Sequence, residues 1–301
     1  MGFETDRHLY RVTDPRYSTH YRHSEAYFRA EMLLQILQVD FGVRYDMSAS
    51  GNFSFRNSRV AFIHGMIPPA GRTIADVPGG TCASMPVMYV AVGHRLGYPL
   101  ELATTRGHTF VRWDGKKHPN PTWRERFNIE GAGEGIGSFP DDHYLTWPVS
   151  VADAEVRADG YLRSLSRQEE LAQFMAARGH CAMDNKQFEF AARCYENAYR
   201  CDPSRACYIW WFAEAAVGTG YVAQTPEMTT LIANWMRSSI GTNNPLLAAD
   251  HHASPARLTT PSSSPRVDPW QPTQPGVPQT PHVMPAAHPS HQPTHFLGNE
   301  P

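Results

Sequence analysis

The chain of 301 residues lacks an excess of either charge, because 27 Lys and Arg residues nearly balance 29 Asp and Glu residues. Nucleic acids and anionic membrane surfaces attract clustered positive charge, so this balance gives no reason to expect either as a partner. No hydrophobic run approaches the roughly 20 residues that a membrane-spanning helix needs. The N-terminus has early acidic residues and no hydrophobic stretch of the kind found in signal peptides. The expected compartment is therefore the cytoplasm.

Cysteine is also scarce, and its spacing does not favour cross-links or metal binding. The five cysteines are Cys82, Cys181, Cys194, Cys201 and Cys207. Because their number is odd and no C-x-x-C pair occurs, neither a disulfide framework nor a structural zinc site is expected. The four downstream cysteines fall in one helical region, where they are expected to be small apolar core residues. The sequence predicts no cofactor and no metal.

Changes in composition divide the chain into four parts. Residues 1–20 are polar and are expected to form a loosely ordered lead-in, and residues 21–155 carry the patterns of a globular domain. Residues 160–225 are predicted to form a small helical unit. Residues 244–301 are rich in Pro, Ser, Thr and His, and their hydrophobic residues are too sparse to offset the entropy of ordering. This last part is predicted to be a disordered tail with polyproline II bias.

The globular part has the pattern of an α+β fold. Hydrophobic spacing predicts a helix over 24–39, with Ser24 as its N-cap and Gly42 at its end. The further predicted elements are a short strand over 60–63, a helix over 83–96, and strands over 99–105, 109–113 and 126–129. A helix followed by antiparallel strands differs from the alternating order of a parallel sheet.

The start of the second helix allows two interpretations, because Pro86 has no N–H to donate within a helix. Either the regular helix begins near Ser84, with Cys82 on the turn before it, or the first helical turn is distorted. Both interpretations leave the Cys82 sulfur near the helix end.

The pattern of residues 166–219 is helical, and Pro203 is expected to divide it into segments over 168–201 and 204–217. Five positions follow the spacing of a tetratricopeptide repeat: Gly179, Ala191, Tyr195, Ala198 and Pro203. A free-standing array needs about three such repeats. This helical unit is therefore expected to dock on the globular domain or on another chain through its aromatic run, Trp210, Trp211 and Phe212.

Cys82 is the strongest candidate for chemistry. It follows Gly79-Gly80 and opens a predicted helix. The partial positive charge at a helix start favours thiolate over thiol. The alternative is a buried and inert thiol, which is the usual state of a free cysteine. The two glycines favour the reactive interpretation, because a cysteine in an apolar core rarely needs such a glycine pair before it.

Two later residues complete a candidate catalytic triad. His108 lies at the start of one predicted strand and Glu130 at the end of the next. An imidazole beside a thiol stabilises the thiolate, and an acid behind the ring fixes its tautomer. Asn128 lies two residues before Glu130 on the same strand face, so either side chain could reach the far ring nitrogen. The alternative interpretation is that one of 15 histidines and a solvated acid lie there without a catalytic role.

The motifs together resemble the transglutaminase-like superfamily, more narrowly a bacterial branch in which a transglutaminase-like domain precedes tetratricopeptide helices. The resemblance covers about residues 24–150, and the helical part extends it to about 220. It is carried by Gly80-Thr81-Cys82-Ala83-Ser84-Met85-Pro86, Tyr89, Leu96-Gly97-Tyr98-Pro99, Gly107-His108 and Asn128-Ile129-Glu130. It implies a papain-like α+β core in which a helix-start cysteine packs on an antiparallel sheet.

In that superfamily the cysteine is the nucleophile, the histidine is the base, and an aspartate or asparagine orients the histidine. The resemblance implies the first two roles for Cys82 and His108, and Glu130 stands where the family often has aspartate. The first functional hypothesis is therefore a cysteine hydrolase or acyltransferase, a protease, amidase or transglutaminase-type enzyme that acts on protein or peptide substrates through a thioester.

The second hypothesis is an inactive transglutaminase-like scaffold that binds partner proteins through its helical unit and tail. The distance between the Cys82 sulfur and the His108 ring discriminates between the two hypotheses. A separation beyond about 5–6 Å would favour the scaffold, because it exceeds hydrogen-bond reach.

Overall fold

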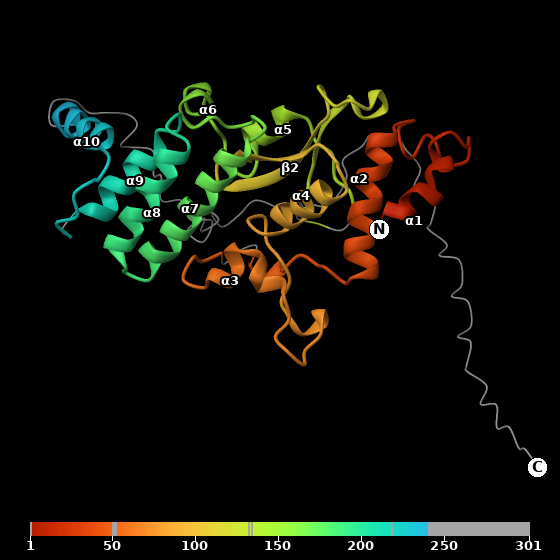
Figure 1. The fold of residues 1–301 in the computed structure, drawn as a ribbon, viewed down its shortest axis with the longest axis horizontal. Coiled ribbons are helices and arrows are strands. Elements are labelled where there is room, and N and C mark those ends of the chain that lie inside the picture. The colour runs from red at the N-terminus through yellow and green to blue at the C-terminus, as the bar shows by residue number, and fades with distance from the viewer. Residues whose placement is uncertain (1, 50–52, 132, 134, 218, 240–301) are drawn as a thin grey trace, which may run out of the picture. The chain divides into compact units, whose positions relative to one another are not determined.

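The computed structural model describes residues 2–49, 53–131, 133, 135–217 and 219–239 (Figure 1). In this part of the chain, helices surround a three-stranded antiparallel sheet of order β1-β2-β3. The strands are β1 Leu100–Thr105, β2 His108–Asp114 and β3 Arg126–Ile129. The predicted α+β class and the three predicted strands are confirmed. The tail predicted over 244–301 lies outside the described residues.

The fourth predicted strand, over 60–63, is wrong. Ser58–Ala61 forms a short helix, α3, and Ile63–Met66 forms a 3₁₀ turn. The Asn57 side chain caps α3 by accepting the Arg59 N–H at 3.1 Å. A run of four apolar residues has too few positions to distinguish a strand from one helical turn, so local capping decides the outcome here.

Helices α2 (Glu25–Gln35) and α4 (Met85–Arg95) pack on one face of the sheet. Ser24 caps α2 as predicted, because its hydroxyl accepts the Tyr27 N–H at 2.9 Å. A π-helical turn, Ile36–Asp40, continues α2. The first interpretation of the Pro86 helix is confirmed: α4 starts after Ser84, and Cys82 lies on the turn before it. The shared core includes Leu33, Leu34, Tyr89, Leu100, Val111, Trp113 and Ile129.

The opposite face of the sheet is covered by α5 (Asp141–Thr146). The Tyr144 ring of α5 stacks on Phe110 of β2 with 3.8 Å between centroids. Arg112 is fully buried beside them, where it donates hydrogen bonds to Asn128 and Asp141. The sequence pattern does not predict α5 or the following helix α6 (Asp153–Asp159), because each is too short to show a hydrophobic period.

The N-terminal residues differ from the predicted loosely ordered lead-in. They form helix α1 (Gly2–Arg7) and a 3₁₀ turn, Leu9–Val12. Asp6 forms an ion pair with Arg29 of α2 at 2.9 Å, and Tyr21 meets Phe28 edge-on with 4.9 Å between centroids. The N-terminal segment has few hydrophobic residues, but these contacts anchor it to α2. The polar composition of the segment does not reveal such contacts.

The helical unit consists of α7 (Arg167–Asp184), α8 (Phe188–Cys201) and α9 (Cys207–Ala216), followed by α10 (Pro226–Ser239). The predicted segment over 168–201 is therefore two helices. The turn between them includes Lys186 at a positive φ of 60°, which ends α7 where no Gly or Pro marks the break.

The helical unit docks on the globular domain, which is the first of the two arrangements expected. The connecting segment 162–165 runs along β1: the Leu162 N–H donates to Thr104 O and the Leu165 N–H to Leu102 O, both at 2.9 Å. The Arg205 guanidinium also donates to the Thr104 hydroxyl at 3.2 Å. These bonds join the start of the helical unit to the edge of the sheet.

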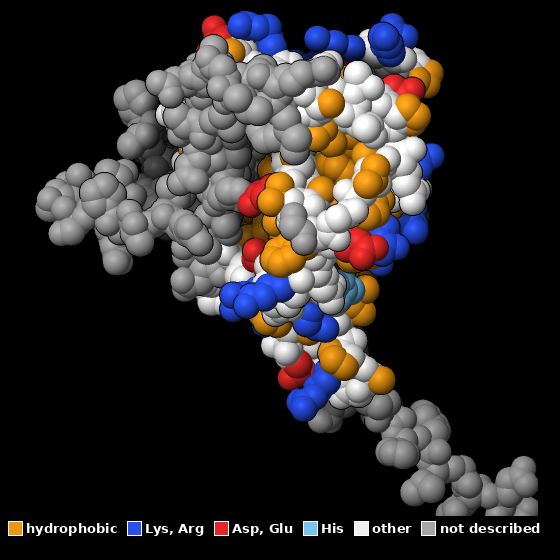
Figure 2. Space-filling view, turned by 90° about the vertical axis from the view of Figure 1, so that its left-hand side faces the viewer, with side chains coloured by type: hydrophobic (Ala, Val, Ile, Leu, Met, Phe, Trp, Pro, Cys, Tyr) orange, Lys and Arg blue, Asp and Glu red, His pale blue; other side chains and the backbone are white. Residues whose placement is uncertain are grey.

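The end of the helical unit carries exposed hydrophobic residues. Figure 2 views the molecule from this end and shows hydrophobic side chains gathered between basic ones. Val217 and Val222, in the segment between α9 and α10, are 70% and 72% exposed. The role of the helical unit as a surface for a partner protein stays a prediction.

Close packing of α7 on α8 gives a testable prediction at Gly179. A Cβ atom there would lie 2.5 Å from Cε1 of Tyr195, whose ring is 1% exposed and has little room to move. Gly179→Ala gains about 1 kcal/mol of helix propensity, but overpacking in a core costs about 1–3 kcal/mol. We expect a net loss of about 1 kcal/mol in the free energy of unfolding, measured by urea titration. Unchanged or increased stability would contradict this close approach.

Candidate active site

The chain before Cys82 is held in a tight and specific conformation. Gly79 has a φ of 117°, and a Cβ atom there would lie 2.4 Å from the carbonyl oxygen of Arg44. The Gly80 N–H donates to the same oxygen at 2.9 Å, and the Asp46 N–H donates to Gly80 O at 2.8 Å. Glycine is therefore required at position 79, because this backbone conformation and this close approach both exclude a side chain.

The turn at Cys82 is fixed by hydroxyl groups on both sides. Thr81 donates to Val60 O at 2.6 Å and accepts the Ala83 N–H at 3.2 Å. Ser84 accepts the Thr81 N–H at 2.9 Å. The Cys82 side chain is half-buried. Among the hydrogen bonds of the described residues, none uses the Cys82 N–H as its donor.

His108 and Glu130 form a buried pair. The His108 Nε2 and Glu130 Oε2 atoms are 2.8 Å apart, and the two side chains are only 3% and 2% exposed. The Tyr144 hydroxyl donates to the same Glu130 oxygen at 3.3 Å, and the Glu130 backbone N–H donates to Gly137 O at 2.7 Å. Glu130 therefore holds one nitrogen of the imidazole and is itself held from two directions.

The protonation of His108 follows from its neighbours. Burial by itself would lower its pKa, but the charge of Glu130 and hydrogen bonds to Cys82 and Glu130 outweigh burial and raise the pKa to about 10. The ring is therefore an imidazolium at neutral pH. Because Glu130 occupies Nε2, Nδ1 is the ring nitrogen that is left to serve the Cys82 thiol.

Aromatic rings shield the His108–Glu130 pair from solvent. The Trp147 ring meets the His108 ring edge-on with 4.6 Å between centroids. Burial, followed by the nearby charge of Glu130, raises the pKa of Tyr144, which keeps its hydroxyl protonated and able to donate. Electrostatic interactions are stronger in such a water-poor environment, so the shield strengthens the pairing.

Of the two candidates for the orienting residue, the structure brings Glu130 to the histidine and directs Asn128 elsewhere. The Asn128 amide accepts from Arg112 at 2.7 Å and donates to Asp141 at 2.8 Å. Both residues share a strand face, but two positions along a strand correspond to a shift of about 6.6 Å. Asn128 is also the register partner of Arg112, which it meets across the sheet.

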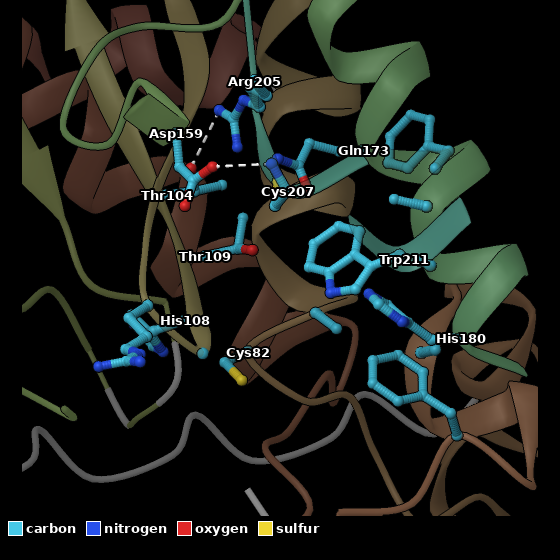
Figure 3. A pocket seen from close by; sticks show the side chains of 18 of the residues that line it. Cys82, Thr104, His108, Thr109, Asp159, Gln173, His180, Arg205, Cys207 and Trp211 are labelled. Carbon is cyan, nitrogen blue, oxygen red and sulfur yellow. Dashed lines mark hydrogen bonds between the residues drawn. The ribbon is translucent and has the colours of Figure 1, made fainter. Parts of the chain in front are cut away.

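Cys82 and His108 line a cavity of about 380 Å³ that extends to the helical unit. Figure 3 shows the two residues on one side of the cavity, with Trp211 and His180 of the helical unit on another. Further wall residues from the helices include Gln173, Phe174 and Ala177. No local pattern in the sequence marks these residues as part of the site. The aromatic run around Trp211 is the one available signal, and it predicts a docking surface.

The other cysteines differ from Cys82 in their surroundings. Burial raises the pKa of Cys181 to about 11, and it also raises the pKa of Cys194 and Cys207. Cys201 is half-buried, as Cys82 is, but it lies at the end of α8. All five are free thiols. Of the two half-buried thiols, Cys82 is the one that lines a cavity together with His108.

Neither a metal cluster nor a membrane-spanning helix is found within the residues that the structure describes. No group of three or more His, Cys, Asp or Glu side chains there could hold a metal ion. Nor does any helix in that part of the chain combine the length and apolar character needed to cross a membrane.

Comparison with known proteins gives no relative from which a function could be transferred. Family models, curated proteins and solved structures were each searched with this chain, and none matches it.

Proposed function

We propose that the chain is a transglutaminase-like cysteine enzyme that transfers acyl groups from amide or peptide bonds. The observation that carries this proposal is the buried His108–Glu130 pair, whose histidine lines the same cavity as Cys82. A thiol, a base and an acid that orients the base are the parts that nucleophilic cysteine catalysis requires.

In the first half of the proposed reaction, the Cys82 thiolate attacks the carbonyl carbon of an amide. A C–S bond forms, and the carbonyl electron pair moves to oxygen. The C–N bond then breaks as the His108 imidazolium gives its proton to the leaving amine. The raised pKa of His108 supports this step, because it keeps the proton on the ring until the amine leaves.

In the second half, water or a second amine attacks the thioester, and His108 accepts the proton of the attacking group. The C–S bond breaks, the product leaves as an acid or a new amide, and Cys82 returns to the thiolate. Glu130 stabilises the imidazolium in both halves. The Cys82 N–H is a candidate donor to the developing oxyanion, since no described hydrogen bond engages it.

The selectivity of thiol alkylation tests the proposed nucleophile. At about pH 6, a free thiol is almost entirely protonated and reacts slowly. We expect iodoacetamide to label Cys82 at least about tenfold faster than the other four cysteines, because the proposed mechanism requires a reactive nucleophile at this position. Peptide mapping by mass spectrometry after timed quenching would give the five rates.

Cys201 is the internal control, because it is half-buried as Cys82 is but lies at the end of α8. His108→Gln should bring the Cys82 rate down to that of Cys201. Equal labelling of Cys82 and Cys201 in the unaltered protein would refute the enzyme and favour the inactive scaffold.

A further inference from the structure

We propose that helices α7 and α9 form a substrate subsite that accepts a large aromatic side chain next to Cys82. This inference rests on the proposed function and deepens it, because it assigns a substrate class to the same site. The helical unit would then determine the specificity of the reaction, in addition to any partner that it binds.

The cavity at Cys82 has walls from both parts of the chain. The globular domain contributes Phe55 and Val87, and the helices contribute Phe174, Ala177 and Trp211. Figure 3 shows Trp211 reaching into the cavity from α9. A volume of about 380 Å³ lies in the usual range for small-molecule pockets and exceeds what one aromatic side chain requires.

The aromatic part of the wall is held in place by contacts between its own members. The Trp211 ring meets His180 edge-on with 4.5 Å between centroids, and Phe55 lies 4.9 Å from His180. The Tyr195 hydroxyl and His180 Nδ1 are 2.8 Å apart. Such a wall is formed before a ligand arrives, which reduces the entropy lost on binding.

The charges around the cavity disfavour an acidic side chain as the occupant. The carboxylates that α7 and α9 contribute to the lining are Asp184 and Glu214. The cations of the lining already have partners: Arg205 donates to Asp202 at 3.1 Å, Arg106 pairs with Glu155 at 3.4 Å, and His108 pairs with Glu130 at 2.8 Å. An anionic substrate side chain would therefore meet like charge without an uncommitted cation from the helices.

The relative magnitudes favour an aromatic occupant over a basic one. Both carboxylates are on exposed residues, and an exposed ion pair changes a binding constant by at most about fivefold. Burial of an aromatic side chain contributes between about tenfold and a hundredfold. Contact with the apolar walls should therefore decide which substrate side chain the subsite binds.

N-substituted iodoacetamides test the subsite through the rate of Cys82 alkylation. The reagents carry ethyl, 2-phenylethyl, 2-aminoethyl or 2-carboxyethyl groups, and each rate is divided by the rate of the same reagent with N-acetylcysteine. We expect the phenylethyl reagent to react at least about tenfold faster than the ethyl reagent. The aminoethyl reagent should gain at most about fivefold, and the carboxyethyl reagent should be the slowest.

A variant that fills the cavity tests whether the preference for the phenylethyl reagent arises there. Ala177→Phe places a ring in the cavity and should bring the phenylethyl-to-ethyl ratio close to one. Leu171→Phe is the matched control, because Leu171 lies on α7, is 43% exposed and is outside the cavity lining. Equal normalised rates for the phenylethyl and ethyl reagents on the unaltered protein would overturn the subsite, as would a faster aminoethyl reagent.

A binding measurement separates failure of the subsite from failure of the proposed function. In the full-length Cys82→Ala protein, N-acetylphenylalaninamide should shift the indole N–H resonance of Trp211, which Trp211→Phe assigns. N-acetylalaninamide at the same concentration should not shift that resonance. If Cys82 is unreactive but the Trp211 resonance shifts, the proposed enzyme is refuted and the subsite is supported. If Cys82 is reactive but the Trp211 resonance does not shift, the subsite is refuted and the proposed enzyme is supported.

Discussion

A Cys82→Ala variant is expected to form no acyl-enzyme with an activated ester. The unaltered protein, mixed with p-nitrophenyl acetate, should release a burst of nitrophenol and carry an acetyl group on Cys82. Removal of the nucleophile leaves no group to form the thioester, so the acylation rate should fall by at least about ten-thousandfold. Stopped-flow absorbance gives the burst, and mass spectrometry of the quenched protein gives the acetylated site.

The matched control is Cys201→Ala, which removes the other half-buried thiol and should leave the burst unchanged. Both variants should retain the circular dichroism spectrum and unfolding midpoint of the unaltered protein. A burst that persists in Cys82→Ala, or that disappears in Cys201→Ala, would assign the acylated group to another residue.

A Glu130→Gln variant is expected to lose both reactivity and stability. The change keeps the shape of the side chain and a hydrogen bond to His108 but removes the buried negative charge. Loss of one partner of a buried ion pair typically costs on the order of 3–5 kcal/mol. Because the pKa of His108 depends on this charge, the ring should become neutral near pH 7 and the Cys82 alkylation rate should fall.

The stability loss has a defined pH dependence. The pKa of His108 is about 10 in the folded protein, against about 6.5 for an unfolded histidine. A raised folded-state pKa stabilises the folded state fully below about pH 6.5, and the gain is lost as pH rises through about 10. The difference in unfolding free energy between the unaltered protein and Glu130→Gln should therefore be largest near pH 6.5 and shrink towards pH 10.

Urea unfolding of both proteins over this pH range would measure the difference. Glu189→Gln is a suitable control, because Glu189 pairs with Arg193 at 2.6 Å on an exposed face of α8. Its effect should stay within about 0.5 kcal/mol at every pH. A difference for Glu130→Gln that grows with pH would contradict a charged His108–Glu130 pair.

Local signals in the sequence were sufficient for the main elements of the globular domain. The strand over 126–129 has the bounds predicted for it, and Ser24 caps α2 as its position before a hydrophobic period indicates. The proximity of His108 and Glu130 could be proposed because the two ends of neighbouring strands meet at one edge of a sheet. The assignment of those residues to a catalytic site stays a prediction.

Other features depend on long-range contacts that no local pattern encodes. The sequence leaves the choice between Asn128 and Glu130 open, and the register of β2 and β3 places Arg112 beside Asn128. The lead-in is ordered through Arg29, which is distant in sequence from its partner Asp6. The cavity wall from α7 and α9 was unforeseen because a helical unit with a repeat-like pattern suggests a partner surface rather than part of an active site.

The segment 162–165 has a consequence for solubility as well as for docking. The outer strand of a sheet presents unpaired backbone groups, which allow sheets of different molecules to join and aggregate. Here the carbonyl groups of Leu102 and Thr104 on β1 already accept hydrogen bonds from this segment. A protein shortened before residue 160 would expose the edge of that strand. The segment 162–165 therefore also protects the protein against self-association.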